Sequence, residues 1–381
     1  MPEFDSYSLR FLESSENVRE SLRLVTGRTP STEVARGASI CLQQGRMFIE
    51  ASARSPMEIR PLLLFYGIAA LARAVVVGHN LKSLATLSQA HGLHDVSEHK
   101  ARLADLEVKI EGNGAFQLFN DTVSAHEGIN YFEGSARRKY LIPTAKSVHF
   151  DRKVISLKEI FARTPTLENL YQLTFREPAK TFPFYFNLDG PPTGPASIRV
   201  DVSELWTDRD SLQTIVESLR MRFPTLRKWR LDKAEIAWDN SVLTFANVPR
   251  EGIDEFGETG LRNEGNHFSA LYHVGNPYLD FCGLLDPVAG GISGGYPFFV
   301  TPMDNHYMSE LSLLYMGMFL LSSLVRYRPQ IWIHAVSRFS DSDRPADDQA
   351  LALTEQFMEL SVSRFLDTVV RLLSPTGYAR A

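Results

Sequence analysis

The sequence predicts an α+β protein in which helices from the N- and C-terminal parts form one discontinuous helical bundle, with a β-rich insertion in the middle. Two strongly apolar helical segments, 60–77 and 308–332, lie near opposite ends of the chain. Alternation of apolar and polar residues with a period of two, which is typical of strands, is concentrated between them. We therefore predict a helical bundle domain at 1–145 plus 303–381 and a β-rich insertion at 146–302.

The N-terminal part carries the start signals of two helices. Pro30 suits the first position of a helix, where its missing N–H costs nothing. Apolar and small residues then recur every three or four positions over 34–52, which predicts an amphipathic helix in close contact with another helix. The sequence Ser-Pro-Met-Glu at 55–58 has the form of a capping box and predicts the start of the next helix. Because that helix is apolar around its circumference, we expect 56–78 to be central and to contact 308–326 directly.

The middle of the chain contains the strand signals. Apolar residues alternate with other residues over 182–188 and 198–202, and Asp239-Asn240 is a plausible hairpin turn between two further strands. The sequence also predicts a second hairpin at 268–285, a helix at 211–222 and a glycine-rich loop at 290–295.

Composition narrows the class of protein. The 381 residues are 44% hydrophobic and 22% charged, which are ordinary values for a globular chain, and the formal net charge of -5 gives no global basic surface for nucleic acid. Two cysteines are too few for a disulfide scaffold or a cysteine-based metal site. The first ten residues lack the features of a signal peptide, so we expect a cytoplasmic protein.

The two apolar segments are short for membrane spans. The first, 61–77, contains Arg73, and the uncharged part of the second covers only 311–325. Both fall below the roughly 20 residues that cross a bilayer core. We therefore expect buried helices of a soluble bundle and no membrane partner.

Four runs of sequence together carry a family resemblance. They are RPLLLFYGIAALARA (60–74), QAHGL (89–93), SLKEIFARTP (156–165) and YPFFVTPMDNHYMSELSLLYMGMFLLSSLVRYRPQIW (296–332). In this combination they resemble the YaaC-like bacterial proteins. The resemblance covers most of the chain in the same order, and it implies an architecture but no assigned activity. The paired helices also resemble those of the HEPN superfamily, many of whose members cleave RNA with an Arg-x4–6-His motif.

That motif occurs no more often than chance placement would produce. The three pairs with the required spacing are Arg73/His79, Arg262/His267 and Arg328/His334. The second pair precedes a predicted strand instead of lying on a bundle helix. In the third, Pro329 is expected to end or kink the helix between the two side chains. Arg328 and His334 are the catalytic candidates if the protein is a nuclease.

Polar residues on and beside the apolar helices are the better candidates for a ligand site. Arg326 and Arg328 combine forked donors with neighbouring aromatic rings, which suits phosphate or base contacts. We expect them to line a polar cleft together with His91 or His306. The structural interpretation, which the residue types favour, is an ion pair: a buried arginine needs a carboxylate, and Glu310 or a neighbouring carboxylate would supply one.

Metal and cofactor signals are weaker. His91, His94 and His99 include a spacing of three, but Gly92 interrupts it and favours a helix end. The Glu-x-Lys sequences at 98–100 and 107–109 are half of a metal-dependent nuclease core, with Asp95 and Asp105 as possible metal ligands, but such triplets are common in charged surface helices. The glycine-rich loop lacks the Lys-Ser/Thr ending of a phosphate-binding loop. We expect no metal and no cofactor.

These observations favour a non-catalytic binding or assembly module of the YaaC-like type, with a cleft for an anionic small molecule or nucleic acid. A protein partner or a second copy of the chain is a further candidate partner. The alternative is a HEPN-like nuclease that acts on RNA in stress or phage defence.

Overall fold

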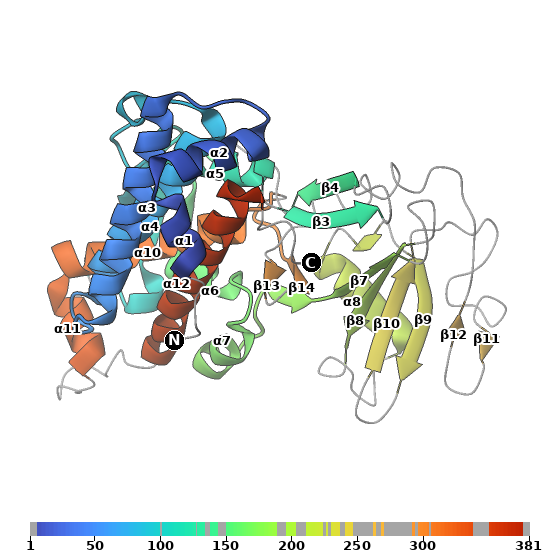
Figure 1. Cartoon of the computed structure of the whole chain (residues 1–381). Helices are drawn as coiled ribbons and strands as arrows, with labels where there is room; N and C mark the ends of the chain where they lie inside the picture. Colours follow the sequence, from blue (N-terminus) through green and yellow to red (C-terminus); the bar gives the residue numbers. More distant parts are fainter. Residues whose placement is uncertain are drawn as a thin grey trace. The chain divides into compact units, whose positions relative to one another are not determined.

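A computed structural model shows a mostly helical α+β protein with small antiparallel sheets in the middle of the chain (Figure 1). It describes residues 6–99, 101–126, 128–133, 138–143, 150–188, 196–202, 211–223, 226–227, 230–236, 241–246, 262–263, 268–269, 292–293, 296–304, 306–337 and 350–375.

The chain divides into two compact units. The first comprises Met1–His126, Ser147–Ala179 and Met308–Ala381, and the second comprises Glu127–Lys146 and Lys180–Tyr307. The first unit therefore combines N- and C-terminal segments. It also includes 147–179, which the sequence analysis assigned to the insertion, because two helices of that segment pack on bundle helices.

Helices make up most of the first unit. They are α1 (Ser6–Leu12), α2 (Ser15–Thr26), α3 (Thr32–Ala53), α4 (Arg60–Asn80), α5 (Ala115–His126), α6 (Leu157–Ala162), α7 (Glu168–Phe175), α10 (Glu310–Tyr327), α11 (Pro329–Ser337) and α12 (Leu351–Leu373). Short 3-10 helices occupy Leu84–Thr86 and Leu103–Asp105. A small antiparallel sheet has the order β1 (Leu93–Asp95), β2 (Glu107–Ile110) and β5 (Val154–Ser156).

The starts of α3 and α4 differ from the predicted ones. Ser31 is the N-cap of α3, since its hydroxyl accepts a hydrogen bond from the amide of Val34, so Pro30 precedes the cap instead of opening the helix. The predicted capping box is wrong. The hydroxyl of Ser55 donates to the carbonyl oxygen of Ala51 and so belongs to the end of α3, while α4 begins only at Arg60.

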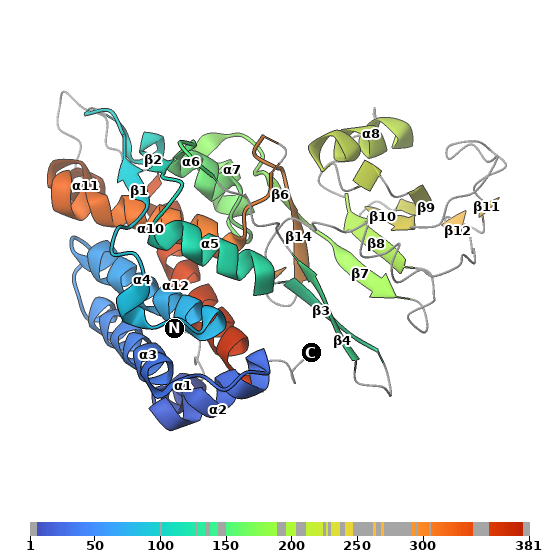
Figure 2. The same cartoon turned by 90° about the horizontal axis from the view of Figure 1, so that it is seen from above.

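The contact between α3 and α4 is as close as the small residues predicted, and the two helices run side by side (Figure 2). A Cβ atom added at Gly67 would lie 2.9 Å from the side chain of Ile49 and 3.1 Å from the carbonyl oxygen of Gly45. A Cβ at Gly45 would lie 2.7 Å from Leu71. The two helix backbones can approach this closely only because both glycines lack a side chain.

Helix α4 is the centre of the bundle, as predicted. It packs against α3, α5, α10 and α12, and the ring of Phe65 lies 5.7 Å from each of the rings of Tyr315 and Phe319 on α10. The predicted contact between the two apolar segments is thus confirmed. By length and composition α4 could cross a membrane, yet 78% of its most apolar 18-residue stretch is buried inside the protein.

A histidine pair lies at the C-terminal end of α4, formed by half-buried His79 and by exposed His126 of α5. The ring of His79 stacks on that of His126 with centroids 4.0 Å apart, and its Nε2 lies 3.0 Å from the carbonyl oxygen of Leu372 on α12. A carbonyl oxygen only accepts, so this nitrogen carries the proton of a neutral ring. Burial and the neighbouring His126 lower the pKa of His79 to about 4.

The histidine pair predicts a loss of stability in acid. The pKa of His79 is lower in the folded state than in the unfolded chain, so its contribution is present above pH 6.5 and is lost as the pH falls towards 4. From the size of the pKa change we expect about 2–3 kcal/mol of unfolding free energy to disappear over this window. Urea unfolding at several pH values will measure it. His79→Gln keeps a donor for the carbonyl oxygen of Leu372, and it should make the unfolding free energy less dependent on pH. The control is His94→Gln at an exposed position, which should leave the pH dependence unchanged. If the unfolding free energy of both variants changes equally with pH, His79 is not the group responsible.

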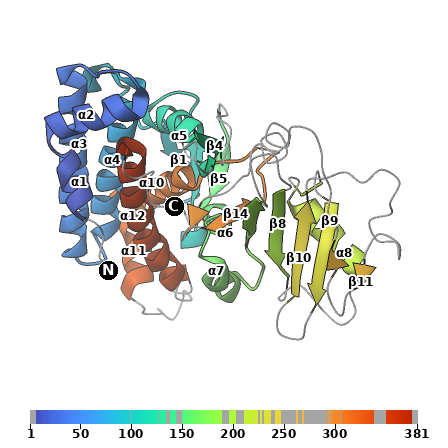
Figure 3. The same ribbon diagram turned by 45° about the vertical axis from the view of Figure 1, so that its right-hand side comes forward.

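The second unit contains the antiparallel strands of the middle region. Its largest sheet has the order β7-β8-β10-β9 (Figure 3). Two smaller sheets pair β3 with β4 and β11 with β12, and a third has the order β13-β14-β6. The elements are β3 (Gly128–Glu133), β4 (Arg138–Pro143), β6 (Thr181–Pro183), β7 (Tyr185–Leu188), β8 (Ala196–Asp201), α8 (Leu212–Arg222), β9 (Arg230–Ile236), β10 (Ser241–Ala246), β11 (Arg262–Asn263), β12 (Phe268–Ser269), β13 (Ile292–Ser293) and β14 (Tyr296–Val300).

Several predicted elements of this unit are present. β9 and β10 pair as the predicted hairpin, with Ser241 opposite Ile236, although its turn at 237–240 lies outside the described residues. The helix predicted at 211–222 is α8. Most of the second predicted hairpin lies outside the described residues, and the predicted glycine-rich loop contains the short strand β13.

Candidate functional site

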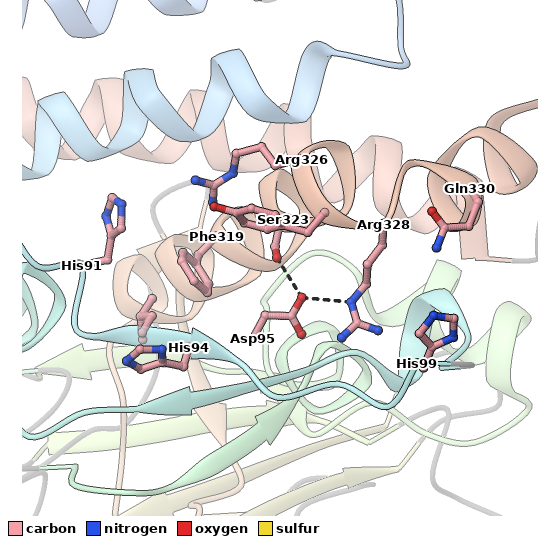
Figure 4. Close-up of a pocket in the computed structure, with 11 residues that line it drawn as sticks. His91, His94, Asp95, His99, Phe319, Ser323, Arg326, Arg328 and Gln330 are labelled. Atoms are coloured by element: carbon pink, nitrogen blue, oxygen red, sulfur yellow. Dashed lines mark hydrogen bonds and ion pairs between the residues drawn. The ribbon is translucent and has the colours of Figure 1, made fainter.

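A polar pocket of about 510 Å³ lies in the first unit, between the chain segment 91–99 and the C-terminal half of α10 with the start of α11 (Figure 4). This volume lies within the range of ordinary small-molecule sites. The lining residues are His91, Leu93, His94, Asp95, His99, Phe319, Ser323, Arg326, Tyr327, Arg328 and Gln330.

Two glycines position the segment that forms the first wall. Gly92 has a φ of 74°, and a Cβ atom there would lie 2.6 Å from the carbonyl oxygen of Asn113. The backbone can therefore pass close to Gly114, at the start of α5. The amide of Phe116 then donates to the carbonyl oxygen of His91, which fixes this histidine at the pocket wall. The segment is a turn followed by β1, so the predicted helix end is wrong.

Asp95 and Arg328 lock the two walls together. The amide and hydroxyl of Ser97 donate to one carboxylate oxygen of Asp95, and the hydroxyl of Ser323 donates to the other over 2.8 Å (Figure 4). The Nε of Arg328 lies 3.3 Å from that second oxygen, and its two terminal nitrogens donate to the carbonyl oxygens of Ser97 and Glu98, each over 2.6 Å. Three donor groups of Arg328 are thus used within the protein.

These contacts keep Asp95 ionised. Burial alone would raise the pKa of its carboxyl group. Hydrogen bonds from Ser97 and Ser323, together with the charge of Arg328, outweigh burial and lower that pKa below its ordinary value. The Asp95–Arg328 pair is therefore a charged, internally balanced unit of the pocket wall.

One face of α10 supplies the second wall. Phe319, Ser323 and Arg326 are spaced four and three residues apart, so they lie on the same side of the helix. The helix ends at Tyr327, and Pro329 opens α11, as the proline predicted. The spacing along this face was present in the sequence and would have identified Phe319 and Ser323 as site residues.

Arg326 has a different environment from Arg328. Among the described residues, its side-chain hydrogen bonds are two long contacts, 3.4 and 3.5 Å, to Ser322 of its own helix, and it lies over the ring of Tyr327 at 4.9 Å from the centroid. Within the described residues it has no carboxylate partner. A guanidinium group that lies over a ring keeps in-plane N–H groups for a ligand. Tyr327 is 69% exposed.

His91 lies half-buried against the rings of Phe65 and Phe319, with centroids 5.7 and 6.1 Å away. Burial lowers the pKa of its imidazole, and the charges of Arg326 and Arg73 lower it further. The histidine is therefore neutral at neutral pH. Two cations lower its pKa, Arg73 from α4 and Arg326 from α10.

Arg73 acts on the site from the side of α4. It lines a separate cavity of about 10 Å³, which has room for no more than one water molecule. No described residue forms a hydrogen bond or ion pair with it. Its charge reaches His91 and also opposes the rise in the pKa of the buried Tyr315 hydroxyl.

The pocket brings together three of the four predicted ligand residues, His91, Arg326 and Arg328. His306 lies in the second unit, is exposed, and is not one of the lining residues. The predicted carboxylate Glu310 pairs with Arg364, 3.4 Å away, because the first turn of α10 faces α12.

The candidate catalytic pairs are not assembled in the pocket. His334 lies on α11, and Arg328 lines the pocket without it. His79 contacts Leu372 and His126, away from Arg73, and His267 lies outside the described residues. No group of His, Cys, Asp or Glu in the described part of the chain has a metal-binding arrangement.

Comparison with known proteins identifies the family. A family model described as YaaC-like Protein matches residues 6–373, nearly the whole chain. Neither the curated proteins nor the solved structures include a significant match. The family match carries no assigned activity, so the pocket must be interpreted from its own chemistry. The chain belongs to the YaaC-like protein family.

Proposed function

We propose that this protein is a non-catalytic binding module whose pocket holds an anionic small molecule. The observation that carries the proposal is the guanidinium group of Arg326, which lines a cavity of about 510 Å³ without a carboxylate partner among the described residues. Charge-assisted hydrogen bonds from arginine to an anion are among the strongest in proteins. The charge of Arg328 is neutralised by its ion pair with Asp95, and this pair forms part of the pocket wall.

A small anion suits the site better than a nucleic-acid strand. The net charge of the chain is -5, and two of the three charged groups lining the pocket neutralise each other. Nucleic-acid binding requires several basic contacts along a phosphate backbone. One free guanidinium group beside one exposed tyrosine ring matches a single anionic group attached to a small organic body.

Arg326→Ala should abolish most of this binding while leaving the fold intact. The lost charge-assisted bonds correspond to about 1.5–3 kcal/mol, or roughly a 10- to 150-fold weaker affinity. Stability should change by less than about 0.5 kcal/mol, because the side chain makes only long contacts within its own helix. Titration calorimetry with inorganic phosphate, sulfate and phenyl phosphate measures the affinity.

The matched control for this experiment is Arg152→Ala, which removes the same charge from a side chain that is 82% exposed and lies outside the pocket. It should bind like the unchanged protein. Equal binding by the Arg326 variant and the unchanged protein would exclude the pocket as the anion site, and failure of all three anions to bind would exclude the proposed function.

The alternative function, a HEPN-like nuclease, requires Arg328 and His334 to act together on RNA. The donors of Arg328 are occupied by Asp95, Ser97 and Glu98, which argues against a catalytic role for this arginine. Incubation with single-stranded RNA, with and without Mg²⁺, tests the alternative directly. Cleavage that is lost in His334→Ala would favour the nuclease over the binding module.

A further inference from the structure

We infer that the anion is a dianionic oxoanion, a phosphate or a phosphate monoester, and that His91 takes up a proton from solvent when this anion binds. This inference rests on the proposed function, since it concerns the same pocket. It specifies the charge of the ligand and a coupled protonation, neither of which the binding proposal requires.

The charge of the ligand follows from the charges around the pocket. Asp95 neutralises Arg328, whereas Arg326 and Arg73 have no carboxylate partner among the described residues. Two uncompensated guanidinium groups therefore act on one half-buried imidazole from α10 and from α4. A monoanion would leave one of these charges unbalanced, while a dianion balances both.

The proton follows from the position of His91 between these groups. Arg326 lines the same pocket as His91, and Arg73 lies in a cavity too small for a ligand, so it acts only through its field. In the free protein both cations oppose protonation of the imidazole. A bound dianion balances both charges and removes their opposition, and the protonated ring then becomes a further donor to the anion.

Neither His94 nor Asp95 replaces His91 in this role. His94 is exposed and lies 3.9 Å from Glu111, and Asp95 is already satisfied by its serines and Arg328. The apolar rings of Phe65 and Phe319 cover His91 and separate it partly from solvent. Its protonation therefore depends on the charge in the pocket.

The test uses sulfate, which remains a dianion throughout the pH range of the experiment. Calorimetric titration of the full chain at pH 6.5, in two buffers with different ionisation enthalpies, counts the protons taken up for each sulfate bound. We expect about half a proton or more for the unchanged protein. Affinity should rise as the pH falls from 7.5 to 6, by up to about tenfold for each pH unit.

His91→Gln should still bind sulfate, with lower affinity, but without proton uptake. His94→Gln, the matched variant in the same pocket, should retain it. A second measurement does not depend on whether a variant folds. In the unchanged protein, NMR titration of the His91 ring should show a higher pKa with sulfate than without it. An unchanged His91 pKa, or uptake that persists in His91→Gln, would overturn the inference.

Three further probes separate the ligand classes. Inorganic phosphate and phenyl phosphate distinguish a free phosphate from a monoester whose ring contacts Tyr327, and acetate represents monoanions. Acetate binding as tightly as sulfate would overturn the dianion assignment and leave the binding proposal intact. Sulfate binding that requires Arg326 but is not accompanied by proton uptake would overturn the protonation of His91 and leave the binding proposal intact. If none of the anions binds, the proposed function is wrong as well.

Discussion

Arg328→Ala is expected to lower the free energy of unfolding by about 2–4 kcal/mol, because it breaks the connection between the two pocket walls. The variant removes two hydrogen bonds to carbonyl oxygens and an ion pair with Asp95. The side chains of both partners are largely buried, with exposed fractions of 18% and 13%. The carboxylate of Asp95 would then lose its only ion-pair partner within the described residues, and burial would disfavour its charge.

Urea unfolding at neutral pH measures this change. Arg152→Ala is again the control, since Arg152 forms a 3.8 Å ion pair with Asp151 at a strongly exposed position. Exposed pairs contribute little, so this variant should stay within about 0.5 kcal/mol of the unchanged protein. If the two variants are equally stable, Arg328 does not join the walls in solution, and its donors would be available for a ligand or for RNA.

Gly67→Val is expected to destabilise the protein by about 3 kcal/mol. The new Cβ would lie 3.1 Å from a backbone oxygen of α3 at Gly45, and a backbone atom can yield only if the two helices separate. It would also lie 2.9 Å from Ile49. The β-branched side chain adds a smaller helix-propensity term.

The control for this packing effect is Gly37→Ala on α3, the helix that packs against α4. A Cβ there would meet Leu84 at 3.5 Å, an ordinary contact, and alanine favours the helical state, so stability should be unchanged or slightly higher. Thermal and urea unfolding compare the two variants. Near-equal stability of Gly67→Val and the unchanged protein would show that the close approach of α3 and α4 is not required.

Much of the bundle could be predicted from the sequence because burial leaves a strong signal. The segments 60–77 and 308–332 are apolar on all sides, and a helix of that kind needs protein around it. The helix starts were harder to place, since Pro30 and Ser31 are adjacent and both favour a helix N-terminus. The hydrogen bond between Ser31 and Val34 decides between them only in the folded chain.

The pocket was predictable in part. Arginines at the end of an apolar helix are unusual enough to mark Arg326 and Arg328 as candidates, and both line the pocket. Their different roles could not be predicted, because the distinction depends on Asp95, more than two hundred residues earlier in the chain. A turn, instead of a helix end, brings that carboxylate to Arg328, and this turn requires the left-handed conformation of Gly92.

The discontinuous bundle has a consequence for synthesis on the ribosome. Helix α4 ends at Asn80, and α10 begins 230 residues later at Glu310. At about 5–20 residues per second, roughly 10 to 50 s pass before α10 is translated. During that interval the apolar surface that α4 later buries against α10 and α12 has no native partner, and the pocket has only one of its walls. The nascent chain therefore exposes an apolar helix until α10 has been made, and we expect its ability to bind a ligand to arise only after that point.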